Sequence, residues 1–500
     1  MVTAMLALSA ASAIAGSDLD NDGYDDLVVG VPDEDVSQAD AAGAVNVLMG
    51  SGKGITKARD KLFTQADLGS TVEVGDRFGN AIAYGDFDND GFDDVAVGSP
   101  TENYNGKKLA GVVHVIYGSA KGANRRDVQL LSQAGPMAGA NEAGDFFGAV
   151  LAAGDFNDDG RDDLAIGVPG ENVRGRIGAG GVVVAFGSRS GITTRRSQFF
   201  TQKGRVPGKA ENFDAFGTAL AVGKLNADGY DDLVIGVPGE DLGAAEDTGA
   251  IVVLYGRKGG LNRRGAAFSQ NGAVVGDNAT GDSMGRALTV GDFNGDGRDD
   301  VAVGLPGKSS SGVEDAGSVL IFSGGPAGLS AAATTSINQD SAIPGDSQEG
   351  DGFGSVLAAG NFNGDKLNGV ALDDLAVGMP QKTVGTQLDA GQVVVVPGSA
   401  TGPDEATSFA FSQNELGRAA EADDTFGASL RVGDFNGDNF DDLVVASPKE
   451  DVGARVDSGI IHIVYGGASG LDLTNAVGFH QATRGIKGKA ESQDRFGTGL

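Results

Sequence analysis

Residues 145–169 have the sequence DFFGAVLAAGDFNDDGRDDLAIGVP, and close variants of it recur along the chain. The stretch contains an Asp-x-Phe-Gly turn, a short apolar run, a loop of alternating acidic or amide residues, and a second apolar run ending in Gly-x-Pro. Short apolar runs bounded by Gly, Asp and Pro are typical of β-strands joined by tight turns. The stretch therefore predicts a strand, an acidic turn and a second strand.

The acidic loop occurs seven times, at intervals of 68 to 73 residues. A Gly-x6-Gly run and the Asp-x-Phe-Gly turn recur in the same register, and in one turn Met284 replaces the phenylalanine. Three features in one register indicate a structural repeat of about 69 residues. The first residues of the seven loops are Asp18, Asp86, Asp155, Lys224, Asp292, Asn361 and Asp434.

Each repeat contains four predicted strands. In the second repeat they span residues 80–85, 94–98, 112–117 and 127–132, and no helical periodicity competes with them. A four-stranded unit repeated radially forms the blade of a propeller. The sequence thus predicts an all-β, seven-bladed β-propeller of four-stranded blades.

Composition limits the classes of function. Of the 500 residues, 84 are glycine, more than twice the roughly 7% of average proteins, as many short strands and turns require. The formal net charge of −32 argues against a nucleic-acid partner, because phosphate contacts need a basic face. There is no cysteine, which excludes disulfides and thiolate metal sites. Of the three histidines, His114 and His462 share one strand position and are expected to pack or to line the lumen, not to form a catalytic pair.

The acidic loops have the spacing of calcium ligands. Carboxylates at positions 1, 3 and 5 of a tight turn converge on one point, and a carbonyl at position 7 and a carboxylate at position 9 complete an oxygen shell. The EF-hand needs an acidic residue at position 12, where these loops place an apolar strand residue. We therefore expect calcium-binding β-hairpin loops and about five Ca²⁺ ions. The predicted ligands are Asp18, Asp20, Asp22, Tyr24, Asp26, Asp86, Asp88, Asp90, Phe92, Asp94, Asp155, Asn157, Asp159, Arg161, Asp163, Asp292, Asn294, Asp296, Arg298, Asp300, Asp434, Asn436, Asp438, Phe440 and Asp442.

Two loops depart from this set and are predicted to bind calcium weakly or not at all. Lys224 stands at position 1 of the fourth loop, where its ammonium is expected to pair with Asp228 and Asp232 in place of an ion. The sixth loop begins at Asn361 and carries an insertion before Asp374. Position 8 is aspartate in all seven loops, so a structural role such as hydrogen bonding the turn is expected for it. The aspartate of Asp-x-Phe-Gly is also expected to be architectural.

These motifs resemble a known family. Asp-x-Phe-Gly followed by D-F-x-x-D-G-x-D-D-L/V-x-V-G-x-P is similar to the FG-GAP repeat of the integrin α-chain N-terminal β-propeller, and the similarity covers nearly all of residues 16–500. It implies FG-GAP blades and a ligand site on the face opposite the calcium loops. The absence of cysteine and the uniform repeat depart from the animal proteins, which favours a bacterial, integrin-like exported protein.

The ends of the chain leave alternatives open. Residues 1–15 are apolar and end in Ala-Ile-Ala, which predicts a signal peptide, with residues 16–500 as the propeller. Alternatively, residues 10–16 form a first strand. The final residues, 496–500, resemble the start of a first strand and either complete blade one as a clasp between the termini or belong to an eighth repeat that the chain cuts short.

The sequence predicts a secreted or cell-surface, calcium-binding adhesion module, monomeric and without a transmembrane segment, whose partner is an extracellular protein or glycan. No catalytic constellation is evident, so a non-enzymatic function is expected. The alternative is a lyase or hydrolase acting on polysaccharide or lipid, or the non-catalytic module of such an enzyme.

Overall fold

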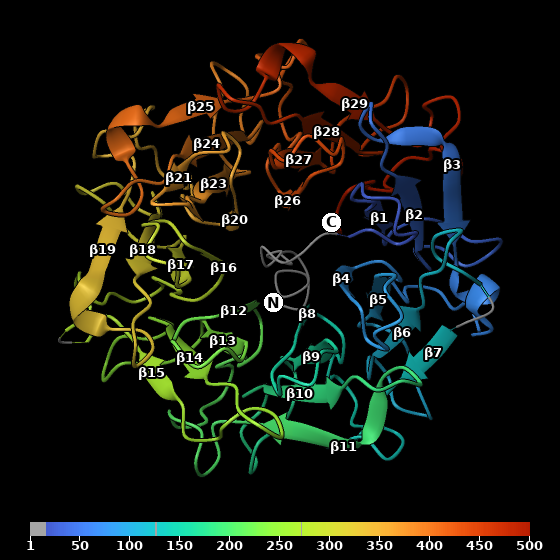
Figure 1. The fold of residues 1–500 in the computed structure, drawn as a ribbon, viewed down its shortest axis with the longest axis horizontal. Coiled ribbons are helices and arrows are strands. Elements are labelled where there is room, and N and C mark those ends of the chain that lie inside the picture. The colour runs from blue at the N-terminus through green and yellow to red at the C-terminus, as the bar shows by residue number, and fades with distance from the viewer. Residues whose placement is uncertain (1–16, 126–127, 272) are drawn as a thin grey trace.

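The computed structural model describes residues 17–125, 128–271 and 273–500. Seven antiparallel sheets follow one another in chain order around a central axis (Figure 1). Within the described residues six sheets have four strands and the first has three, apart from a small added hairpin. The predicted all-β, seven-bladed propeller is confirmed. The predicted signal peptide, residues 1–15, lies outside the described residues.

The strands lie close to their expected positions, and the blades differ little from one another. Blades one to three contain β1 (Leu27–Val31), β2 (Ala44–Met49), β3 (Thr56–Phe63); β4 (Ala81–Gly85), β5 (Asp94–Ser99), β6 (Val112–Ile116), β7 (Val128–Leu131); and β8 (Leu151–Gly154), β9 (Asp163–Val168), β10 (Gly181–Phe186), β11 (Thr193–Phe200). Blades four and five contain β12 (Leu220–Gly223), β13 (Asp232–Val237), β14 (Ala250–Leu254), β15 (Ala266–Phe268); and β16 (Leu288–Gly291), β17 (Asp300–Leu305), β18 (Ser318–Phe322), β19 (Thr334–Ile337). Blades six and seven contain β20 (Val356–Gly360), β23 (Asp374–Met379), β24 (Gln392–Val396), β25 (Phe409–Phe411); and β26 (Ser429–Gly433), β27 (Asp442–Ser447), β28 (Ile460–Val464), β29 (Val477–Phe479).

Helices are few and short. The described residues contain four 3-10 helices, each of three or four residues: η1 (Gln65–Leu68), η2 (Ala331–Ala333), η3 (Glu405–Thr407) and η4 (Leu473–Asn475). No helix in the described part of the chain has the length and apolar character needed to cross a membrane.

Blade one is joined to the C-terminal residues. The backbone N–H of Gly30 in β1 donates to the carbonyl of Gly499 at 2.7 Å, and the N–H of Gly497 donates to the carbonyl of Gly30 at 3.0 Å. The C-terminal segment therefore lies beside β1 as β4 lies beside β5, and the C-terminus is close to β1 in Figure 1.

The core is divided into seven apolar clusters, one at each junction between neighbouring blades. The Phe-Gly phenylalanine, such as Phe147, or Met284 in its place, is buried against the preceding blade. The first glycine of the preceding Gly-x6-Gly run permits this approach: Gly111 has a φ of +80°, and a Cβ there would lie 2.1 Å from the carbonyl oxygen of Phe147. The repeated glycines are thus placed where blades meet.

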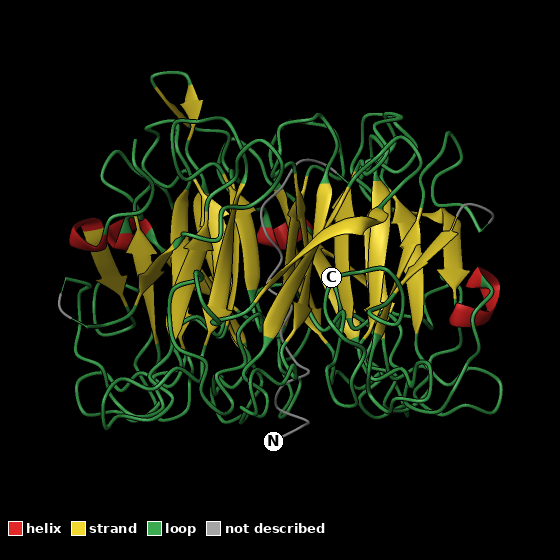
Figure 2. Cartoon of the chain, turned by 90° about the horizontal axis from the view of Figure 1, so that it is seen from below, coloured by secondary structure: helices red, strands yellow, loops and turns green. Residues whose placement is uncertain are grey.

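The loops divide between the two ends of the ring (Figure 2). In blades two to seven the acidic loop joins the first strand to the second, and in blade one it precedes β1. Hydrogen bonds between neighbouring acidic loops place them all at one end, which we call the loop end. The hairpin β21 (Lys366–Leu367) and β22 (Val370–Ala371) forms the insertion of the sixth loop and projects beyond its neighbours in Figure 2. Connections from the second strand to the third, and from one blade to the next, share the opposite end.

Candidate metal centres

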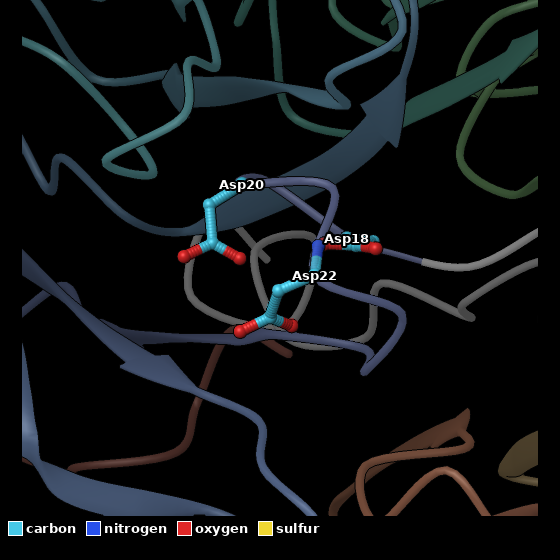
Figure 3. Close-up of side chains that lie close together, drawn as sticks. All are labelled: Asp18, Asp20 and Asp22. Carbon is cyan, nitrogen blue, oxygen red and sulfur yellow. The ribbon is translucent and has the colours of Figure 1, made fainter.

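The first acidic loop brings three predicted ligands together. One carboxylate oxygen from each of Asp18, Asp20 and Asp22 lies within 4.8 Å of the others, and Figure 3 shows the three side chains side by side on the loop. In the second loop the same criterion groups Asp86, Asp88 and Asp94. Both loops therefore have the hard oxygen donors that a calcium ion requires.

Two of these oxygens are buried without a hydrogen-bond partner: Oδ1 of Asp20 and Oδ1 of Asp88. Burial, and then the carboxylates of Asp20 and Asp18, raise the pKa of Asp22. Burial and the carboxylates of Asp90 and Asp86 likewise raise the pKa of Asp88. Like charges held this close disfavour ionisation, so a cation at either point would relieve the repulsion.

Position 1 also shapes the loop. The Asp18 carboxylate accepts hydrogen bonds from the N–H of Asp22 at 3.0 Å and of Gly23 at 2.7 Å. The same two contacts, to positions 5 and 6, recur in the loops that begin at Asp86, Asp155, Asp292 and Asp434. An aspartate at position 1 therefore fixes the turn that brings the other ligands together.

Loops with asparagine at position 3 are arranged differently. The side-chain amides of Asn157, Asn294 and Asn436 donate to the position-9 aspartates of their own loops. At position 7, Arg161 and Arg298 pair with the position-5 carboxylates, at 3.1 Å and 3.3 Å. In these three loops no three carboxylates of the described residues meet the criterion that groups the first two. The position-7 carbonyls, those of Tyr24, Phe92 and Phe440 among them, remain predicted ligands.

Position 9 has a structural role in all seven units. One oxygen of each aspartate, beginning with Asp26, accepts the N–H of the second glycine of Gly-x6-Gly at 2.8–3.0 Å. Burial raises the pKa of Asp26 to about 8. Asp232 and Asp374 make the same contact in the two degenerate loops, so this hydrogen bond does not depend on a complete ligand set.

Position 8 joins neighbouring blades. The side chain of each position-8 aspartate accepts a hydrogen bond, at 2.6–3.0 Å, from the backbone N–H of position 1 in the adjacent blade. Its own N–H donates to the carbonyl of the same residue at 3.0–3.3 Å. In the degenerate loops position 8 is Asp231 or Asp373, which accepts from the N–H of Asp155 or Asp292 in the preceding blade, and this explains why position 8 persists there. The expected structural role is confirmed, but the turn that is bonded belongs to the adjacent blade.

The expected substitution of an ammonium for an ion in the fourth loop is wrong. Lys224 is exposed and makes no ion pair with Asp228 or Asp232 among the described residues. Asn226 contacts these two aspartates instead of Lys224. Its Oδ1 accepts from the N–H of Asp228 at 2.7 Å, and its Nδ2 donates to Asp232 at 3.1 Å. A cation is present at the first loop instead, where Arg59 of β3 forms an ion pair with Asp20.

The end opposite the loops carries an apolar pocket of about 420 Å³. It lies among blades three, four and five, and Phe146, Ile177, Phe213 and Pro238 contribute its apolar lining. Ile177 is 61% exposed and Phe213 is 47% exposed. The pocket occupies the face where the sequence placed the binding loops, although composition and spacing identified none of its residues.

Known proteins share this repeat. A sequence model described as the FG-GAP repeat matches residues 10–48, 78–116, 147–185, 216–254, 284–322 and 426–464. Integrin alpha pat-2 of Caenorhabditis briggsae is 29% identical over 252 residues, covering 48% of this chain and 18% of the integrin. The chain is an integrin-like FG-GAP β-propeller. The matched residues leave out the sixth repeat, which carries the β21–β22 insertion.

Other relatives of the FG-GAP propeller are enzymes by name. Phosphatidylinositol-glycan-specific phospholipase D of Bos taurus is 32% identical over 180 residues, covering 36% of this chain and 20% of the enzyme. The propeller thus spans about a fifth of the length of these curated relatives. The Bacillus licheniformis rhamnogalacturonan lyase has a TM-score of 0.34 at 14% identity, covering 79% of this chain and 69% of the lyase. That similarity is too low to support an argument about function.

A second set of repeated polar residues, at the end opposite the loops, was not identified from the sequence beyond its aspartates. The Asp-x-Phe-Gly aspartates are buried, and Oδ2 of Asp76 accepts the N–H of Glu73 at 2.7 Å, which fits the architectural role expected of them. Two residues after the proline of Gly-x-Pro stands a glutamate or lysine: Lys308 and Lys382 pair with the aspartates, and Glu102 and Glu450 each accept from a glutamine that follows the fourth strand. The signal was available as a nearly constant separation: Gln65 and Glu102 are 37 residues apart, as are Gln413 and Glu450, and Gln202 and Glu240 are 38 apart.

Proposed function

We propose that the five complete loops bind calcium and that the ions brace the propeller. The support is the convergence of Asp18, Asp20 and Asp22, together with the buried, unpartnered Oδ1 of Asp20. Bound calcium would neutralise carboxylates that otherwise repel one another, and the aspartates of positions 1 and 5 would hold it together with the aspartate or asparagine of position 3. An exposed acidic turn would not bury an oxygen without a partner, because this costs about 1–3 kcal/mol.

We further propose that the propeller is a secreted or cell-surface adhesion module, monomeric, that binds an extracellular protein or glycan at the apolar pocket. The observation that carries this proposal is the exposure of Phe213 and Ile177 on the walls of one hollow. The backbone of Phe213 has a φ of +66°, which is costly for an aromatic residue. A rigid apolar surface with a few polar neighbours, here Asn172 and Asp247, is typical of ligand sites.

A pair of matched variants tests the ligand site. Ile177 and Leu388 stand at the same repeat position, three residues before the first glycine of Gly-x6-Gly, and Leu388 is 66% exposed. Only Ile177 lines the pocket. On a glycan and protein array, Ile177→Asp and Phe213→Ala should each lose binding at least tenfold, whereas Leu388→Asp should bind like the wild type. Equal loss in all three variants would contradict the assignment of this pocket.

The same array separates adhesion from catalysis. We propose that the propeller binds its ligand without converting it, so a product assay on every glycan captured should show no cleavage. Turnover would favour the alternative, an enzyme acting on polysaccharide or lipid. Secretion is tested separately by expressing the full chain and a version without residues 1–15, because only the full chain should be exported.

A further inference from the structure

Seven polar clusters lie at the end opposite the loops, one at each junction between blades. Each is defined by three repeat positions: a glutamine from one blade, and from the next blade the Asp-x-Phe-Gly aspartate and the residue two positions after the Gly-x-Pro proline. We name each cluster by that last residue. The clusters are Gln65–Asp76–Glu102, Gln133–Asp145–Glu171, Gln202–Asp214–Glu240, Gln270–Asp282–Lys308, Gln339–Asp351–Lys382, Gln413–Asp424–Glu450 and Gln481–Asp494–Glu34. The glutamines Gln133 and Gln339 make no side-chain hydrogen bond among the described residues.

Two clusters contain a lysine, which shows what the position accommodates. The ammonium of Lys308 lies 2.8 Å from Oδ2 of Asp282 and 3.4 Å from Oε1 of Gln270, and it also donates to the carbonyl of Asp277. The ammonium of Lys382 lies 2.6 Å from Oδ2 of Asp351 and donates to the carbonyl of Asp346. In both, the carbonyl precedes the aspartate by five residues. A cation is therefore held there by carboxylate, carbonyl and, beside Lys308, amide oxygens.

The other five clusters have a second carboxylate where the lysine stands. In the Glu450 cluster, Arg418 supplies a positive charge at 3.3 Å. The Glu34, Glu102, Glu171 and Glu240 clusters have no ion pair with lysine or arginine among the described residues. In three of these four the glutamine donates to the glutamate at 2.6–2.7 Å, which turns the amide oxygen away from that carboxylate. Two buried acids in each thus lack the cation that the lysine clusters contain.

Buried oxygens without a hydrogen-bond partner occur in these four clusters, and also as Oδ1 of Asp282 in the Lys308 cluster and as the glutamine Oε1 in the Lys382 and Glu450 clusters. Oδ1 of Asp76, Asp145 and Asp214 has no hydrogen-bond partner, although each of these side chains is fully buried. Oε2 of Glu171 is also unpartnered, as is the amide oxygen of the glutamine in each of the four clusters. A buried oxygen without a partner is unfavourable, and a ligand that bonds it removes that cost. These atoms belong to the groups that surround the ammonium in the Lys308 cluster.

We propose that the Glu34, Glu102, Glu171 and Glu240 clusters each bind a calcium ion at the place that the ammonium occupies in the lysine clusters. The exchange of Glu for Lys changes the side-chain charge by two, and a divalent cation restores the balance. The two carboxylates are hard oxygen donors, which calcium prefers, and the lysine clusters show that a backbone carbonyl at this place can add another. These sites are distinct from the acidic loops, because they lie at the other end of the strands and link one blade to the next.

A reciprocal exchange of residues tests this proposal. Glu171→Lys recreates the arrangement of the Lys308 cluster, and Lys308→Glu recreates that of the Glu171 cluster. Bound calcium per full-length chain is measured at pH 7.5 by equilibrium dialysis and elemental analysis. We expect Glu171→Lys to bind one ion fewer than the wild type and Lys308→Glu to bind one more. Circular dichroism checks folding, and Glu102→Lys provides a second test with the same readout.

The competing occupant is a proton shared by the two acids. Burial raises the pKa of Glu171 to about 8, so this pair would hold a proton near neutrality in the absence of metal. If calcium content is the same in the wild type and both exchange variants, the clusters bind no calcium and the proposal is overturned. The loops are tested independently, because Asp18→Asn changes the loop count without touching a cluster. A loss in Asp18→Asn but not in Glu171→Lys would support the proposed function and reject this inference.

Discussion

Oδ2 of Asp25 accepts a hydrogen bond from the backbone N–H of Asp434 at 2.8 Å, although the two residues are 409 positions apart. The N–H of Asp25 returns a bond to the Asp434 carbonyl at 3.1 Å. This pair is the last of seven equivalent joints, and it connects blade seven to blade one. The propeller is thus held at its loop end by a closed circuit of aspartate-to-backbone hydrogen bonds.

We predict that Asp25→Ala lowers the free energy of unfolding by about 1–3 kcal/mol, because it leaves the Asp434 N–H without its partner. Asp25→Asn retains an acceptor oxygen and should cost less than half as much. Chemical denaturation measures both. The control is Asp40→Ala, an exposed aspartate, which should change stability by less than about 0.5 kcal/mol. A cost for Asp25→Ala no greater than that of the control would show that the joint contributes nothing.

Alanine at the glycine position of Gly-x-Pro should be tolerated only in blade seven. A Cβ on Gly236 would lie 2.0 Å from the carbonyl oxygen of Gly285 in the next blade, a backbone atom that cannot move freely. Blade seven has Ala446 at the equivalent position. Gly236→Ala should therefore destabilise the protein by about 1–3 kcal/mol, as overpacking does elsewhere, measured by chemical denaturation. Ala446→Gly is the matched control, and an equal effect of both changes would refute the steric explanation.

Two buried histidines should make the fold sensitive to acid. His114 is fully buried, its Nε2 lies 2.8 Å from Oγ of Ser70, and its ring packs edge-on against Phe78. Burial lowers the pKa of His114 to about 4, and that of His462 also to about 4. The stability that each neutral, buried histidine contributes is therefore complete above about pH 6.5, the pKa of histidine in the unfolded chain. It is lost as the pH falls from there toward 4.

Other blades have valine at this strand position, for example Val183, so His114→Val is a matched substitution. Between pH 7.5 and 5, we expect the free energy of unfolding of the wild type to fall by about 2 kcal/mol for each of the two buried histidines. In His114→Val the fall should be about 2 kcal/mol smaller, because only His462 contributes. Denaturant midpoints across this pH range measure the difference. Parallel pH profiles for the two proteins would contradict it.

The fourth loop should gain calcium when its first ligand is restored. Lys224→Asp gives the loop the ligand order of the third, with Asn226, Asp228 and Asp232 already in place. We expect one additional ion per chain by equilibrium dialysis, and we expect Asp155→Lys to remove one. Unchanged calcium content in both variants would show that position 1 does not decide occupancy.

The sequence predicted what is local and repeated. Strand positions such as β5 (Asp94–Ser99) follow from short apolar runs between turn residues, and the acidic loops follow from alternation over a few positions. The number of blades follows from the spacing. The convergence of Asp18, Asp20 and Asp22 was also predictable, because one tight turn contains all three.

Contacts between repeats were harder to predict. The sequence shows that Asp25 recurs at position 8, but not that its partner is Asp434 in the adjacent blade. The role of Lys224 was misjudged because a long exposed side chain can point toward several carboxylates, whereas the short Asn226 is fixed by the turn. The pocket at Phe213 depends on three separate connections meeting at one end, which no local pattern encodes.

The central claim, that calcium bound by the acidic loops braces the propeller, is tested most directly by thermal unfolding of the full chain with excess calcium and with chelator. Binding at a hundred times the dissociation constant stabilises a fold by roughly 2.7 kcal/mol per site. We predict a melting temperature at least several degrees higher with calcium, and a smaller difference when Asp18 and Asp86 are both changed to Asn. Superimposable melting curves with calcium and with chelator would contradict the account.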